Sequence, residues 1–208
     1  LEKVPAAKFN ATLQGMLQEI IKNHKRVIFN GDNYTAEWAK EAEKRGLPNF
    51  KKTPEALDSL LSKKAEHLFA KYKVLSKTEL HSRYEVYIEE YKKTILIEGK
   101  LALDMVKTII LPIAIRQQGN IAENVIRLKA IGVTAGAAEQ KDKAVVIGEL
   151  IADLSATCEK LEKAIEDHKI DAVVKDTAGL RISVDKLEKE VDDDMWPLPK
   201  YGEMLFVY

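Results

Sequence analysis

The sequence has few of the residues that usually mark a special fold or an extracellular protein. It holds one cysteine, Cys158, in 208 residues, so no disulfide can form within the chain and a reducing compartment, the cytoplasm, is expected. No apolar run of 18 residues and no signal-peptide pattern is present, which argues against a membrane span and against secretion. The 33 basic residues balance the 33 acidic ones, so nothing predicts a nucleic-acid or anionic membrane partner.

Motifs that carry chemistry are missing as well. The sequence contains no HExxH or ExxH pair for a metal, no GxSxG for a nucleophile, and neither GxGxxG nor GxxxxGK[ST] for phosphates. The glycines of Gly132–Gln140 fit no phosphate loop and predict a plain connection between helices. From the residues alone we therefore predict no catalytic, cofactor-binding or metal-binding residue in this chain.

What the sequence does contain is helical periodicity, most of all over residues 76–131. This stretch is predicted to be one very long helix, or two helices joined near Pro112, where the missing N–H predicts a kink. Two apolar lines predict that the helix is covered on two sides, at the centre of a bundle. The first line comprises Leu80, Tyr84, Tyr87, Tyr91, Glu98, Met105 and Pro112, and the second Ile88, Ile95, Leu103, Val106, Ile110 and Ile113.

Other periodic segments flank the long helix, and together they predict an all-α fold, an elongated antiparallel helical bundle around 76–131. Helices are expected over 9–23, over 36–45 with Thr35 as cap and Gly46 after the end, and from Thr53 to about Tyr72. Ser76 and Glu79 form a capping box. Two lines of matching spacing predict an antiparallel pair: Ile147, Ile151, Leu154, Cys158, Leu161, Ile165 and His168, then Val173, Thr177, Leu180, Val184, Leu187 and Val191. The one short β-leaning run is Val27–Phe29.

Three places allow a functional interpretation beside a structural one. Glu98, on the first apolar line, is either a buried carboxylate with a raised pKa or, as we favour, the partner of a basic residue. The basic cluster 22–26 is either a phosphate site or a helix end with favourable cations, which we favour. Cys158 and His168 are too far apart for a local metal pair, so a packed thiol and a helix-end imidazole are expected.

The last residues, Met195–Tyr208, combine apolar side chains with Pro197 and Pro199. The prolines predict a non-helical tail, and its apolar content predicts that it docks on its own bundle or on a neighbouring subunit. We expect Trp196 to lie in a pocket between helices with its indole N–H donating a hydrogen bond, and Tyr201 and Phe206 to cover apolar surface nearby.

Three stretches resemble type III glutamine synthetases. The segment after their catalytic core is similar to residues 24–49, HKRVIFNGDNYTAEWAKEAEKRGLPN. The start of their C-terminal helical region is similar to residues 75–98, LSKTELHSRYEVYIEEYKKTILIE, and their C-terminal tail is similar to residues 196–206, WPLPKYGEMLF. Their order and spacing also fit, although together they cover under a third of the chain. A start without Met in a segment that is already helical is expected of a fragment.

The resemblance implies a limited set of functions. Residues 1–52 would close the catalytic domain, and residues 53–208 would be the C-terminal helical domain, a structural region for assembly that is inactive alone. The parent enzymes join ammonia to glutamate with ATP and Mg or Mn, and assemble as double rings of identical subunits. Their metal, substrate and nucleotide residues precede Leu1, so no site residue is carried over. The alternatives are a stand-alone helical interaction module and an enzyme that uses bundle carboxylates.

Overall fold

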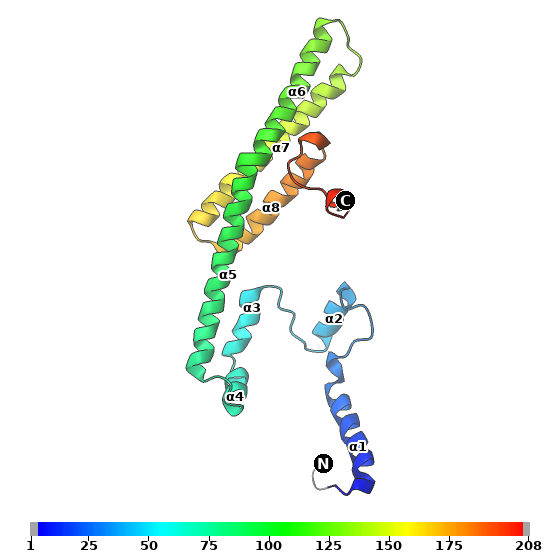
Figure 1. Ribbon diagram of the computed structural model, residues 1–208, viewed down its shortest axis with the longest axis vertical. Helices are drawn as coiled ribbons and strands as arrows, with labels where there is room; N and C mark the ends of the chain where they lie inside the picture. Colours follow the sequence, from blue (N-terminus) through cyan, green and yellow to red (C-terminus); the bar gives the residue numbers. More distant parts are fainter. Residues whose placement is uncertain (1–3, 206–208) are drawn as a thin grey trace. The chain divides into compact units, whose positions relative to one another are not determined.

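The computed structural model describes residues 4–205, in which every regular element is a helix (Figure 1). The all-α prediction is therefore confirmed, and Val27–Phe29 forms no strand: a 3₁₀ turn, η1 (Lys25–Val27), is followed by extended chain. The chain divides into two compact units, an N-terminal unit (Leu1–Tyr84) and a C-terminal unit (Glu85–Tyr208). Each is described by itself.

The N-terminal unit consists of short helices with few buried side chains. Helix α1 (Ala6–His24) and helix α2 (Ala36–Lys44) lie where the periodicity predicts them. Gly46, at φ 69°, ends α2 in a Schellman motif in which the N–H of Leu47 bonds the carbonyl of Ala42. Thr35 does precede α2, but its hydroxyl donates to the carbonyl of Asp32 at 2.9 Å and does not cap the helix.

The prediction of one continuous helix from Thr53 to about Tyr72 is wrong, because this segment is divided into three elements. The structure has α3 (Thr53–Leu57), a 3₁₀ turn η2 (Asp58–Leu61), and α4 (Lys63–Lys71). Ser62 breaks the run because its backbone is extended and its hydroxyl accepts a hydrogen bond from the N–H of Ala65 at 3.2 Å, so it starts a new helix. Pro54 does lie in the first turn of α3, as its fixed φ favours.

The long helix is confirmed, from Lys77 to Ala130, as α5 (Lys77–Met105), a π-helical turn η3 (Val106–Ile110) and α6 (Leu111–Ala130). The capping box is also confirmed, since Ser76 N and Oγ donate to Glu79 Oε2 at 2.8 and 2.7 Å and Glu79 N donates to Ser76 Oγ at 3.3 Å. The irregularity expected at Pro112 lies in the turn before it, where the N–H of Leu111 bonds the carbonyl of Val106.

The π-helical turn also keeps one face of the long helix buried. Val106, Ile110 and Ala114 follow one another at intervals of four residues. In a regular helix of 3.6 residues per turn, side chains at this spacing would move gradually away from the buried face. A wider turn absorbs the extra residue, and all three side chains are buried. Of the two predicted apolar lines only the second is buried in its central part. The first is not, because Tyr87, Glu98 and Pro112 are exposed.

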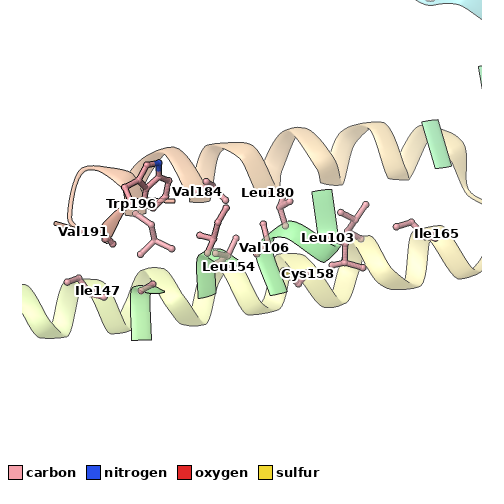
Figure 2. Packing of buried hydrophobic residues seen from close by; sticks show 14 of the residues in the cluster. Leu103, Val106, Ile147, Leu154, Cys158, Ile165, Leu180, Val184, Val191 and Trp196 are labelled. Atoms are coloured by element: carbon pink, nitrogen blue, oxygen red, sulfur yellow. The ribbon is translucent and has the colours of Figure 1, made fainter. Parts of the chain in front are cut away.

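In the C-terminal unit, α7 (Ala137–Glu166) packs against both α6 and α8 (Ile170–Glu188). The chain reverses between each pair, so the antiparallel pair predicted from the matching spacing is confirmed (Figure 1). Figure 2 shows the core that they enclose with α5 and η3. Its fully buried members include Ile147, Leu154, Leu161, Val173 and Leu187. Between α6 and α7, the amide of Gln118 donates to the carbonyl of Ala144 at 3.0 Å.

The connections around α7 are shorter than predicted. The loop before it spans only 131–136, so the predicted loop Gly132–Gln140 is too long. His168 was expected on the buried line of α7, and this is wrong: it is exposed at φ 53° after the end of the helix. There the N–H of Lys169 bonds the carbonyl of Ala164 at 2.9 Å, so a non-glycine residue fills the left-handed position of a Schellman motif.

The C-terminal tail is docked in its first half. After a 3₁₀ turn η4 (Asp193–Met195), the prolines keep the chain extended, and Trp196 is 9% exposed against the core, as predicted. No described residue accepts a hydrogen bond from its indole N–H. The prediction of a wholly non-helical tail is wrong, because the short helix α9 (Tyr201–Leu205) follows the prolines. At its start, Glu203 Oε2 accepts a hydrogen bond from the N–H of Lys200 at 2.9 Å. The side chain of Tyr201 and residue Phe206 lie outside the part that the structure describes.

Candidate interaction surfaces

The C-terminal unit carries an apolar groove of about 760 Å³ over the π-helical turn. Val106 and Ile110 contribute to its lining from η3, Thr177 and Val184 from α8, and Trp196 from the tail. A groove of this size and lining is typical of a surface that receives an apolar side chain or small apolar group. Thr177 lines this groove, and its hydroxyl is buried without a hydrogen-bond partner among residues 4–205.

Two ion pairs lie at the edge of this groove, which Glu188 also lines. Arg181 Nε donates to Asp185 Oδ1 at 2.6 Å, one turn apart on α8. Lys200, which also lines the groove, is paired with Asp193 of η4. Each pair joins opposite charges, so the two pairs hold the rim and the tail in place. The groove is therefore suited to apolar contact.

A second, smaller pocket of about 340 Å³ lies where α5 and η3 meet the end of α7, and its character is ionic. Lys107 Nζ donates to both carboxylate oxygens of Glu162 at 2.7 Å, and this hydrogen bonding raises the pKa of Lys107. Close by, burial raises the pKa of the Cys158 thiol. A thiol with a raised pKa is a poor nucleophile, so the structure supports the packed thiol expected from the sequence.

Glu98 does not lie where the sequence placed it. Its side chain is exposed on α5, and the structure shows no hydrogen bond or ion pair to it within residues 4–205. Both interpretations, the buried acid and the buried ion-pair partner, assume that Glu98 is buried, and both are therefore wrong. The buried neighbour is Gly99, where an added Cβ would lie 2.7 Å from Val173 Cγ1. Gly99 marks the close approach of α8 to α5, a signal that sequence reasoning missed.

The basic cluster 22–26 lies at the end of α1, as the favoured helix-end interpretation requires. Lys22 and His24 are in the last turn of α1, and the Arg26 side chain is exposed. A carbonyl of this segment has a structural role: Arg45 Nη1 donates to the carbonyls of Arg26 and Ile28 at 3.2 and 2.8 Å. Among the described residues no group of three His, Cys, Asp or Glu side chains is placed to hold a metal ion.

The stretch 24–49 folds onto itself through its aromatic residues. Phe29 stacks on Trp38 with ring centroids 4.6 Å apart, and the guanidinium of Arg45 lies 5.7 Å from the Trp38 ring. Gly31 lies close to this stack, because a Cβ there would lie 2.7 Å from the Phe29 ring and the ring would have to shift. The next residues form a turn in which Asp32 Oδ1 accepts from the N–H of Tyr34 at 2.9 Å, and the Tyr34 side chain is 99% exposed.

Helix α1 has an apolar face that no described residue buries. Phe9 and Met16 are each 38% exposed, Leu17 and Ile20 each 47%, and Leu13 is half-buried. At 100° per residue these five side chains share one side of the helix, with Ile21 at its edge. We call them the α1 face. None of the residues of α1 is buried, which sets this helix apart from α7 and α8.

Comparison with known proteins decides the family. The family model described as the glutamine synthetase C-terminal domain matches residues 12–129. The chain belongs to this family. Three glutamine synthetases are similar to it: the type-3 enzyme of Dictyostelium discoideum (30% identical, 100% of this chain), that of Butyrivibrio fibrisolvens (30%, 92%) and that of Bacteroides fragilis (31%, 92%). The chain covers 30%, 29% and 28% of their lengths, so it spans less than a third of each relative.

The family match spans the first two quoted stretches, 24–49 and 75–98, and the alignment with the type-3 enzyme of Dictyostelium discoideum covers the third as well, so the resemblance is confirmed. It extends over Gly99 and the π-helical turn, which lie outside those stretches. No helix within residues 4–205 is long and apolar enough to cross a membrane.

Proposed function

We propose that this chain is the non-catalytic, C-terminal structural part of a larger glutamine synthetase. The complete enzyme would join ammonia to glutamate with ATP and Mg or Mn, in the cytoplasm. Residues 1–52 would close its catalytic domain and residues 53–208 would form the helical domain that helps hold identical subunits together. The observation that carries the proposal is the family match over residues 12–129 together with relatives more than three times as long.

The two units of the structure support a role in assembly. The C-terminal unit has its own core, so it can present the groove over the π-helical turn as a preformed surface. Apolar side chains that stay exposed on the long helix, such as Ile97 at 65%, Leu101 at 58% and Ile126 at 67%, add to the surface open to a neighbouring subunit. Exposed apolar side chains gathered on one element are typical of protein–protein contacts.

Two measurements test this function. The first incubates the 208-residue chain with glutamate, ammonium, ATP and Mg or Mn, and we expect no formation of glutamine. The second compares the complete protein with a variant that ends after Lys73, ahead of the Ser76–Glu79 capping box, by analytical ultracentrifugation. We expect the truncated protein to lose its native assembly. Turnover that rises with the concentration of the chain, or an unchanged assembly after truncation, would contradict the proposal.

A further inference from the structure

The α1 face is apolar throughout, and the rest of α1 consists of charged, polar and small residues, apart from Ile21 at the edge of the face. The charged residues of the helix, Lys8, Glu19 and Lys22, lie outside the arc of the face. Their signs are mixed, whereas helices that lie on membranes present a strongly basic polar side. The face therefore matches an apolar protein surface, and no buried cation or anion is needed opposite it.

A helix of this kind does not stay folded through its own hydrogen bonds alone. Isolated helices of fewer than about 12–15 residues are marginal in water, and even longer ones gain most of their stability from packing of the apolar side. The 19 residues of α1 include no buried side chain, and Lys8, Thr12 and Gln14 face water. A stable α1 thus requires a surface that the described part of this chain does not supply.

The relatives indicate where that surface is. The chain covers 28–30% of their lengths, and the matching family is a C-terminal domain, so most of such a protein precedes the matched part. Helix α1 is the first helix of the chain, next to that preceding part. A helix tethered directly to a domain meets it at a high effective concentration, often in the millimolar range, which a second copy does not share.

We propose that the α1 face packs against the part of the same polypeptide that precedes residue 1 in the complete enzyme. This inference rests on the proposed function and names the surface through which the C-terminal part joins the rest of the subunit. Leu17 and Ile20 lie within this contact, while Gln14 and Gln18, which are exposed and lie outside the arc of the face, stay in water.

The test compares amide hydrogen exchange of α1 in the complete protein and in the 208-residue chain alone. We expect exchange at least tenfold slower in the complete protein. The double variant Leu17→Lys with Ile20→Lys should remove this protection, while Gln14→Lys with Gln18→Lys, which adds the same charge to the same helix, should keep it. In the chain alone both double variants should melt like the original, because these side chains are exposed there.

Other occupants of the α1 face give other results. Equal exchange of α1 in the two proteins overturns the inference. Protection in the chain alone that grows with its concentration to the level of the complete protein points to a second copy and also overturns it. So does protection of the chain by phosphatidylcholine–phosphatidylglycerol vesicles without protection in the complete protein. Ligase activity of the complete protein, measured separately, shows whether the proposed function itself has failed.

Discussion

The two units of this protein are built from similar helices but differ in what holds them together. Of the 20 buried hydrophobic residues in the described part, 18 belong to the C-terminal unit and only Ala42 and Leu80 to the N-terminal unit. The C-terminal unit buries the inner sides of three long segments against each other. The N-terminal unit relies on caps, turns and one aromatic stack.

This difference indicates that helical propensity and capping suffice to shape a segment but not to stabilise it. Burial of apolar surface is the dominant favourable term in folding, at about 25 cal/mol per Å². The C-terminal unit has this term within itself, so it is expected to fold alone. The N-terminal unit leaves its apolar side chains, above all the α1 face, for contacts elsewhere. The proposed contact of the α1 face with the preceding part of the polypeptide would supply the burial that this unit lacks.

The largest expected effect comes from removing part of the C-terminal core. Leu154 on α7 is fully buried, and Leu154→Ala should lower the free energy of unfolding by about 2–5 kcal/mol through lost burial and the cavity left behind. Native-state hydrogen exchange would report this for α7 and α8. If the two units are independent, exchange in α2 should not change with it.

Ile182 provides the matched control for Leu154. It lies on α8 of the same unit and is 59% exposed. Ile182→Ala should change the free energy of unfolding by no more than about 0.5 kcal/mol, since surface substitutions away from special features have small effects. Comparable losses from both substitutions would mean that the core is not the source of stability, and faster exchange in α2 would show that the units are coupled.

A medium effect is expected at the crossing of α5 and α8. Gly99→Ala places a Cβ 2.7 Å from Val173 Cγ1, so α8 or the side chain must move, at a cost of about 1–3 kcal/mol. Gly119→Ala, in α6, is the matched control, because no atom lies within 4 Å of the added Cβ and alanine favours the helix by about 1 kcal/mol. Urea unfolding should therefore shift in opposite directions for the two variants. A stabilising Gly99→Ala would contradict the close approach of the helices.

The sequence predicts the fold well where regular periodicity or a capping motif acts locally. The long helix, the capping box and the antiparallel pair of α7 and α8 all follow from spacing. The errors lie where tertiary packing or backbone conformation decides. Glu98 shares a line with apolar residues but is exposed, because α8 approaches α5 at the neighbouring Gly99 instead. His168 ends α7 in a left-handed conformation for which no glycine gives a signal.

The candidate surfaces were harder to predict than the fold. The apolar line of α1 is visible in the sequence, but an apolar line predicts burial, and only the structure shows that none of α1 is buried. The groove over the π-helical turn combines residues of η3 with residues of α8 and the tail that lie about 70 to 90 positions later in the chain. No local pattern brings such segments together. Trp196 was found because aromatic residues beside prolines in a tail predict docking.

The smallest effect is expected at the start of the long helix, in the unit that lacks a core. Ser76→Ala removes the hydroxyl that accepts from the N–H of Glu79 and should weaken the first turn by about 1 kcal/mol. The amide and hydroxyl of Ser76 also donate to Glu79, and these hydrogen bonds lower the pKa of that carboxyl. The stabilisation from Glu79 is therefore present at neutral pH and is lost as the pH falls through its lowered pKa.

The pH dependence separates the capping box from a general weakness of the N-terminal unit. Exchange of the amides of 77–80 in the original chain should quicken, relative to the intrinsic rate, below the ordinary glutamate pKa of about 4.3. Ser76→Ala should show a smaller acid effect, because only the backbone hydrogen bond to Glu79 remains. Ser59→Ala, in η2 of the same unit, is the control that leaves Glu79 untouched and should keep the full acid effect. An equal acid effect in Ser76→Ala and the original chain would assign it to other carboxylates, such as Glu66, whose pKa is lowered by His81 and Lys77.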